Sequence, residues 1–377
     1  MPKVFNWQIG RDMDYLYDGA RPKKQFGMVM DLNKCIACQT CTIACKTTWT
    51  SGRGQEYQFW NNVESKPYGY YPLGWDVRIL EKLGVQPISA GPYQGKTIFE
   101  AAPEGERVLG YRPEDMDYTS PNVGEDDSTG GIINEGGAYL QMPHMQWMFY
   151  LPRICNHCTY PACLGACPRQ SVYKRPEDGI VLIDQTRCRG YRECVKGCPY
   201  KKPFFNALNR TSEKCVGCYP AVEVGQQTRC TIGCIGKIRL QGFINTPDKA
   251  REDNPLDYIV HIAKVARPLF PQLGLEPNVY YIPPMHVPSW FLKQMFGATV
   301  DQAVNVYRRA AEDKKLLGAL MLFGATKEIS HHYKVDGDIV TGYTESGDEI
   351  IRVPMHEPII TRAVFDEKLQ AYRSNIT

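Results

Sequence analysis

Short apolar stretches alternate with longer polar segments along this chain. Three of them have the length and bounding turn residues that are typical of short buried strands. They are FGMVMDL (26–32), GIVLIDQ (179–185) and IRLQGFI (238–244), and each lies beside a group of cysteines. The pattern predicts small antiparallel hairpins next to cysteine-bearing loops, which is an α+β fold.

The C-terminal third shows a helical period and then an alternating one. Residues 300–323 predict one amphipathic helix. Its expected apolar face comprises Val304, Tyr307, Ala311 and Leu320. Residues 333–353 alternate and contain Asp-Gly and Ser-Gly pairs, which predicts hairpin structure. We expect the chain from His331 onward, including the tail MHEPIITR (355–362), to act as an arm that docks on a partner.

A long segment without cysteine separates the first two predicted strands. Residues 51–144 are rich in Gly, Pro and Tyr and contain the acidic run Glu125, Asp126 and Asp127. Long irregular segments of this kind usually cover or bind something. We interpret the segment as a docking surface for a partner, with surface decoration as the alternative.

Composition and charge exclude several classes of protein. The chain has 377 residues with 44 Lys and Arg against 41 Asp and Glu, so a net charge of +3 does not favour a nucleic-acid binder. The longest uncharged apolar stretch (316–326) has about half the ~20 residues that a membrane-spanning helix needs. The first residues show neither an apolar signal core nor paired arginines, so we expect no export signal in this chain.

All 15 cysteines fall into four short groups. The groups are Cys35, Cys38, Cys41 and Cys45; Cys155, Cys158, Cys163 and Cys167; Cys188, Cys194 and Cys198; and Cys215, Cys218, Cys230 and Cys234. In the third group Tyr191 stands where the spacing of the other groups would place a fourth cysteine. Such grouping does not suit a disulfide framework, which spreads cysteines over the loops of a small secreted chain.

The spacing favours iron–sulfur clusters. A tight loop supplies three thiolates to one cluster, and the last cysteine of the run ligates a different cluster, so the groups work in pairs. Zinc is the alternative, because paired C-x2-C units also occur in zinc ribbons. The C-x2-C-x2-C-x3-C run and the two Cys-Pro endings favour iron–sulfur over zinc.

In order and spacing, the four groups resemble those of the iron–sulfur beta subunits of the dimethyl-sulfoxide-reductase superfamily. This family includes the beta subunits of nitrate, chlorate, perchlorate and selenate reductases, ethylbenzene dehydrogenase and nitrite oxidoreductase. The resemblance covers about 6–284, and its most specific stretches are 54–77, 151–168 and 188–206. FNWQIG (5–10) and 54–77 look most similar to the nitrite oxidoreductase branch.

The resemblance implies a pairing of the cysteine groups. Cluster one would be held by Cys35, Cys38, Cys41 and Cys234; cluster two by Cys45, Cys215, Cys218 and Cys230; cluster three by Cys155, Cys158, Cys163 and Cys198; and cluster four by Cys167, Cys188 and Cys194. This pairing implies two nested bacterial-ferredoxin-like units. The first would comprise 1–50 and 206–250 and the second 145–205, with the insertion 51–144 and a C-terminal extension 251–377.

Tyr191 sets the expected type of cluster four. The family's nitrate reductases have Trp at the matching position. A phenol is a poor ligand for a soft iron–sulfur cluster, so three thiolates and an aromatic side chain favour loss of one iron. We expect three [4Fe–4S] clusters and one [3Fe–4S] cluster, with a phenolate or water holding a fourth iron as the alternative.

Several basic residues adjoin the cysteines in sequence. They are Lys46, Lys196, Lys201, Lys202, Arg187, Arg189 and Arg192. They either raise cluster potentials by offsetting negative charge or are simply solvated loop charges.

The resemblance implies a subunit that transfers electrons and has no catalytic residues of its own. It would connect a molybdenum catalytic alpha subunit with a haem-bearing gamma subunit, most simply in nitrite oxidation or nitrate reduction. Alternatives are the same role in a chlorate, perchlorate, selenate or hydrocarbon-oxidising relative, a self-contained redox enzyme, or a zinc-stabilised interaction protein. We expect co-export with the catalytic subunit to the periplasmic side, or else a place on the cytoplasmic face of the membrane.

Overall fold

The structure is a computed structural model that describes residues 2–19, 21–66, 75–85, 89–110, 147–356, 364–368 and 370–373. Its central element is a mixed sheet with the order β10-β3-β12-β11. The strands are β3 (Gln25–Asp31), β10 (Arg239–Ile244), β11 (Arg267–Pro268) and β12 (Val279–Ile282). β3 pairs antiparallel with β10 and parallel with β12. Two strands predicted from the sequence, one beside the first cysteine group and one after the last, are therefore confirmed as direct neighbours.

Five further two-stranded antiparallel sheets are present among the described residues. They are β1 (Lys3–Asn6) with β2 (Arg11–Asp14), β4 (Asn62–Lys66) with β5 (Phe149–Arg153), β6 (Val172–Lys174) with β7 (Val181–Ile183), β8 (Phe204–Asn206) with β9 (Thr211–Glu213), and β16 (Val364–Asp366) with β17 (Ala371–Arg373). β7 confirms the third predicted strand, although it is shorter than the apolar stretch.

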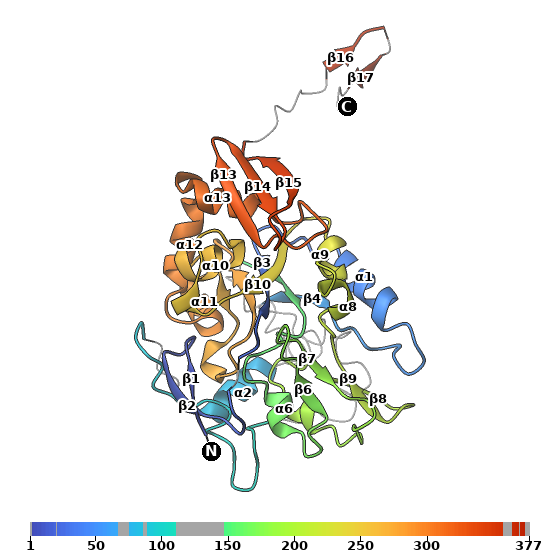
Figure 1. Cartoon of the computed structure of the whole chain (residues 1–377), viewed down its shortest axis with the longest axis vertical. Coiled ribbons are helices and arrows are strands. Elements are labelled where there is room, and N and C mark those ends of the chain that lie inside the picture. The colour runs from blue at the N-terminus through green and yellow to red at the C-terminus, as the bar shows by residue number, and fades with distance from the viewer. Residues whose placement is uncertain are drawn as a thin grey trace, which may run out of the picture.

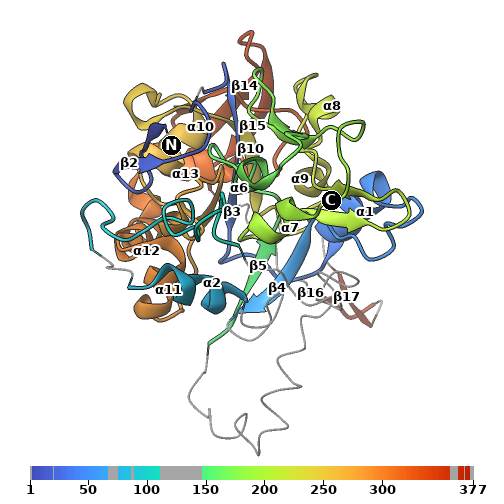
Figure 2. The same ribbon diagram turned by 90° about the horizontal axis from the view of Figure 1, so that it is seen from below.

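Helices lie on both sides of the central sheet. Those near the cysteines are α1 (Thr40–Trp49), α6 (Ala162–Ala166), α7 (Glu193–Gly197), α8 (Tyr219–Val222) and α9 (Arg229–Ile232). The others are α2 (Trp75–Leu83), α10 (Pro255–Asp257), α11 (Ser289–Phe296), α12 (Val300–Arg308) and α13 (Lys314–Met321), with single turns at 247–249, 258–262, 271–273 and 310–312. Figures 1 and 2 show α1, α8 and α9 on one side of β3 and β10, and α10 to α13 on the other.

The prediction of a single helix at 300–323 is wrong. The chain forms α12 and α13 with a break between them, because the Asp313 side chain accepts hydrogen bonds from the backbone N–H groups of Lys315 and Leu316 and starts a new helix. The break also shifts the apolar face: Ala310 is buried, whereas Ala311 is exposed. Val304 and Leu320 are buried as predicted.

The hairpin structure expected at 333–353 is confirmed. β13 (His332–Asp336), β14 (Ile339–Tyr343) and β15 (Glu349–Pro354) form an antiparallel sheet. Tyr333 and Val340 of this sheet are buried in one core with Val29 of the central sheet. The chain from His331 to Pro354 is therefore part of the fold, and a docking arm would begin after it. Most of MHEPIITR lies outside the described residues.

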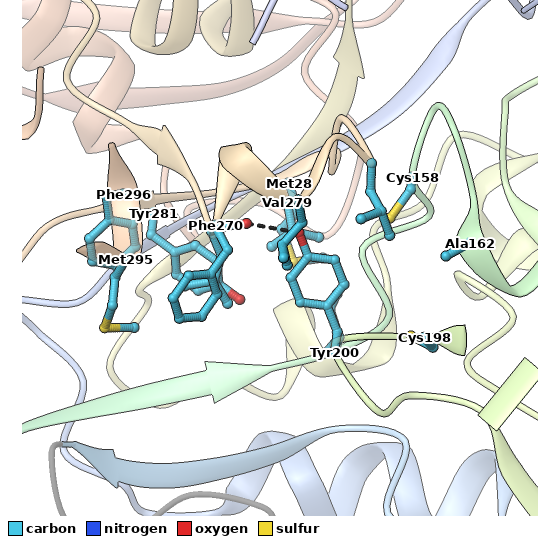
Figure 3. Packing of buried hydrophobic residues seen from close by; sticks show 14 of the residues in the cluster. Met28, Cys158, Ala162, Cys198, Tyr200, Phe270, Val279, Tyr281, Met295 and Phe296 are labelled. Carbon is cyan, nitrogen blue, oxygen red and sulfur yellow. Dashed lines mark hydrogen bonds between the residues drawn. The ribbon is translucent and has the colours of Figure 1, made fainter. Parts of the chain in front are cut away.

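One hydrophobic core joins segments that are distant in sequence. It includes residues of the N-terminal hairpin, the insertion, the cysteine-rich segments and the chain from 269 to 304. Figure 3 shows Tyr200 between Cys198 and the aromatic side chains of Phe270 and Tyr281. The Tyr200 hydroxyl donates to the Leu269 carbonyl over 2.8 Å. The C-terminal extension thus packs directly against the cysteine-bearing part of the chain.

Described parts of the insertion also build the fold. β4 pairs with β5, and Ile98, Phe99 and Leu109 are buried. The acidic run at 125–127 lies outside the described residues, so the docking role of the insertion stays a prediction. Over the described ranges, no helix is long and apolar enough to cross a membrane.

Candidate metal centres

The cysteines line four separate small cavities. Cavity one is lined by Cys35, Cys38, Cys41 and Cys234; cavity two by Cys45, Cys215, Cys218 and Cys230; cavity three by Cys155, Cys158, Cys163 and Cys198; and cavity four by Cys167, Cys188 and Cys194 together with Tyr191. The structure thus brings together the same four sets of residues that the family resemblance implies.

The C-x3-C spacing distributes cysteines between neighbouring cavities. Residues four apart lie on one face of a helix, one turn from each other. Cys41 and Cys45 at α1 therefore line cavities one and two, and α9 with Cys230 and Cys234 repeats this arrangement in the opposite direction. α6 and α7 carry the corresponding pairs of cavities three and four.

Left-handed backbone conformations close the cysteine loops. Ala37, His157, Arg192 and Cys218 have φ between 41° and 61°. These turns bring backbone N–H groups close to sulfur, as at Gly217, whose N–H donates to Cys215 Sγ over 3.4 Å. Such donors stabilise thiolates and cluster sulfides.

The thiols are crowded and mostly buried. Burial, followed by the fields of neighbouring thiolates, raises the pKa of the Cys158 and Cys163 thiols well above the usual value. Burial likewise raises the pKa of Cys218 to about 11. Buried thiolates become favourable when a bound metal supplies compensating positive charge, so metal binding would release protons here.

Cavity four differs from the other three. Tyr191 lines it and is 57% exposed. Burial would raise the pKa of the Cys167 thiol, but hydrogen bonds from the hydroxyl and the N–H of Ser171 outweigh burial and lower it. The backbone N–H of Ser212 donates to Cys188 Sγ over 3.4 Å.

The basic residues that adjoin the cysteines divide into buried and solvated ones. Lys201 and Lys202 are 1% exposed, whereas Arg187 and Arg189 are exposed. Lys201 Nζ donates to the carbonyls of Val195 and Lys196 near the end of α7. Arg187 and Arg189 are therefore solvated loop charges, whereas an effect of the buried lysines on cluster potentials stays a prediction.

Lys46 and Lys196 are engaged elsewhere. Lys46 Nζ donates to backbone carbonyls of the insertion, over 3.0 Å at Glu56. Lys196 forms a 2.9 Å ion pair with Glu106. Lys202, in contrast, lines cavity three and donates to Asn62 Oδ1 over 2.6 Å, and burial lowers its pKa to about 7.

Three further side chains close to sulfur were not found from the sequence. Trp49 Nε1 donates to Cys218 Sγ over 3.2 Å, and Arg239 Nη2 donates to Cys41 Sγ over 3.1 Å. Lys214 lines cavity three and is fully buried. Its position directly before Cys215 was an available signal, whereas Arg239 lies in a predicted strand with nothing to mark it.

The residues present fit iron–sulfur clusters. Each cavity offers soft thiolate donors, and Nε and Nη1 of Arg239 in cavity one are buried without a hydrogen-bond partner among the described residues. An anionic cluster is a natural partner for such donors. Among the residues that the structure describes, no group of three or more His, Cys, Asp or Glu side chains is arranged to hold a single metal ion.

Comparisons with known proteins agree with this chemistry. Residues 146–243 match the family model of the 4Fe-4S dicluster domain. The chain is 42% identical to the selenate reductase subunit beta of Thauera selenatis, over 79% of this chain and 96% of that protein. It is 40% identical to the chlorate reductase subunit beta of Ideonella dechloratans, over 80% and 97% respectively. The respiratory nitrate reductase subunit beta of Haloferax mediterranei is 42% identical, over 76% and 86%.

These similarities place the chain in the class of ferredoxin-like proteins that bind [4Fe–4S] clusters. The chain belongs to the family of iron–sulfur beta subunits of the dimethyl-sulfoxide-reductase superfamily, as the resemblance of its cysteine groups implied.

Proposed function

We propose that this chain relays electrons within an oxidoreductase complex and performs no catalysis itself. Iron–sulfur clusters supply one-electron transfer when they are bound. The observation that carries the proposal is the linear order of the four cavities. α1 and α9 each join cavities one and two, and α6 and α7 each join cavities three and four.

Cavities two and three are also neighbours. Ile154 lines cavity two and Cys155 lines cavity three, and Lys214 and Cys215 link the same two cavities in the reverse order. The four sites therefore follow one another from one to four. Clusters in this order would pass electrons from one end to the other.

The proposed ligands are the four cysteine sets that line the cavities. They would hold three [4Fe–4S] clusters and, at Cys167, Cys188 and Cys194 beside Tyr191, one [3Fe–4S] cluster. The pairing of β3 with β10 supports two nested ferredoxin-like units, with 145–205 inserted between 1–50 and 206–250.

The proposed partners stand at the two ends of the row. Relatives are named as subunits beta of selenate, chlorate and nitrate reductases, so a catalytic partner carrying molybdenum is proposed at the end of cluster one. A haem-bearing gamma subunit is proposed beyond cluster four. The complex would act on the periplasmic side after co-export, or on the cytoplasmic face of the membrane.

Nitrite oxidation or nitrate reduction is the leading proposal for the complex. It rests on FNWQIG and 54–77. FNWQIG also has a structural task, since Asn6 Nδ2 donates to the Gly274 carbonyl over 3.0 Å and the Trp7 N–H donates to Glu276 Oε2 over 3.2 Å. Chlorate, perchlorate, selenate and hydrocarbon substrates remain the alternatives.

The test compares the purified complex with the isolated chain. In the complex, the clusters should change oxidation state on addition of nitrite or nitrate. The isolated chain, with its clusters intact, should not turn over any of these substrates with artificial electron carriers. Turnover by the isolated chain would favour a self-contained enzyme, and zinc in place of iron would favour an interaction protein.

A further inference from the structure

Arg239 is a fully buried cation between cavities one and two. It is the first residue of β10 and is 0% exposed. Its Nη2 donates to Cys41 Sγ over 3.1 Å and to Asn61 Oδ1 over 3.0 Å. Its Nε and Nη1 are buried and have no hydrogen-bond partner in the described part of the chain.

Arg239 adjoins both cavities. It lines cavity one together with Cys41 and Cys234. Asn61, which accepts a hydrogen bond from Nη2, lines cavity two together with Cys230. The guanidinium therefore lies against a sulfur ligand of one site and is bonded to the wall of the other.

Lys214 repeats this arrangement one step along the row. It is fully buried, and its Nζ donates to the carbonyls of Val181 and Cys215, the latter over 2.8 Å. Lys214 lines cavity three together with Cys155 and Cys163. Cys215, whose carbonyl accepts from Lys214 Nζ, lines cavity two.

We infer that Arg239 and Lys214 are fixed counter-charges, each shared by two neighbouring clusters and raising the reduction potentials of both. This inference rests on the proposed function. Reduction adds one negative charge to a cluster, and a buried cation nearby favours the reduced form because the interior screens charge weakly. A cation between two clusters also offsets the repulsion between them when both are reduced, so that electrons can occupy adjacent sites.

Substitutions of the two cations should affect two pairs of clusters that share one member. Arg239→Gln should lower the potentials of clusters one and two, and Lys214→Gln those of clusters two and three. Each substitution should therefore shift two midpoint potentials, with one affected cluster common to both variants. We expect each reduction equilibrium constant to fall at least tenfold, which is about 59 mV for one electron.

Potentiometric titration of the holoprotein, followed by electron paramagnetic resonance, measures these shifts. Lys237→Gln is the control, because it removes an exposed charge two residues from Arg239 in sequence that lines neither cavity. It should not move any potential by tenfold. Arg239→Lys, which restores the charge, should recover most of the shift seen with Arg239→Gln.

Several outcomes overturn the inference. Unchanged potentials in Arg239→Gln and Lys214→Gln, equal shifts of all four clusters, or equal shifts in Lys237→Gln would each contradict it. If Arg239→Gln does not assemble, Lys214→Gln with Lys214→Arg as its control decides on clusters two and three. A wild-type protein without clusters would instead contradict the proposed function itself.

Discussion

Tyr191 is the residue on which the expected cluster composition depends. It takes the place of a fourth cysteine at cavity four and is largely exposed, whereas Cys188 and Cys194 beside it are buried. A neutral phenol competes poorly with a thiolate for iron. We therefore expect the identity of this one side chain to decide between three and four irons in the proposed cluster four.

Tyr191→Cys should convert cluster four into a [4Fe–4S] cluster. The added thiolate completes the ligand set, so the paramagnetic signal of the oxidised three-iron cluster should disappear while the other clusters remain. Tyr191→Phe is the matched control and should keep the signal, because it removes only the hydroxyl. A three-iron signal that persists in Tyr191→Cys would mean that backbone geometry sets the cluster type.

Glu100 ties the insertion to the N-terminal hairpin. Both of its carboxylate oxygens accept hydrogen bonds from Arg11 of β2 over 2.8 Å. Burial would raise the pKa of Glu100, but the bonds from Arg11 and Thr97 outweigh burial and lower it to about 2. A lowered carboxylate pKa contributes stability that is complete above the unfolded value of about 4.5 and is lost as pH falls toward 2.

Glu100→Gln should therefore destabilise the protein at pH 7 by ~1–2 kcal/mol, a figure reduced for solvent screening of this partly exposed pair. The difference from wild type should be smaller at pH 4 than at pH 7 in thermal unfolding. Exposed Glu104→Gln should have little effect at either pH. A loss that grows on acidification would show that Arg11 does not stabilise the carboxylate.

At the level of helices and strands, the cysteine spacing was a better guide to the site than the apolar helical pattern was to the C-terminal helices. C-x3-C needs only one turn of helix, so α1, α6, α7 and α9 follow from local geometry. The break between α12 and α13 depends on one capping contact of Asp313, which the apolar period does not reveal. The proposed roles of Arg239 and Lys214 could not be predicted from the sequence, because each depends on two cavities that meet only in the folded chain.

Two truncations separate the folded sheet from the tail. Removal of 355–377 should leave the clusters assembled and weaken binding to the partner. Removal of 331–377 also deletes β13 to β15 and the buried Tyr333 and Val340, so it should lower the unfolding temperature and the yield of holoprotein. Iron content and co-purification measure both effects. If the chain without 331–377 stays fully stable, β13 to β15 belong to the docking arm and not to the folded body.

At the scale of the whole molecule, cavities one to three adjoin the main hydrophobic core, which itself contains Cys41, Cys158, Cys198 and Cys230. The extension from 269 onward packs against the cysteine-bearing segments, with Tyr200 at the contact (Figure 3). The position of the extension could not be predicted from the sequence, because β12 joins the sheet beside β3 by a long-range parallel pairing. We expect this packing to keep the distances between the proposed clusters fixed, which electron transfer requires.

Iron analysis of the purified holoprotein should give about 15 iron atoms per chain, from three four-iron clusters and one three-iron cluster. Zinc should be near zero. About 16 irons with no three-iron signal would contradict the role of Tyr191 alone. Zinc bound by the cysteines would remove the basis for electron transfer altogether.

Electrons are proposed to pass along the four sites between partners, and freeze-quench electron paramagnetic resonance of the complex can follow this transfer. The fully oxidised complex is mixed with its electron donor for less than one turnover and frozen at successive times. We predict that the cluster signals of this chain change before the terminal acceptor is reduced. Cluster signals that stay unchanged while the acceptor is reduced would contradict the claim.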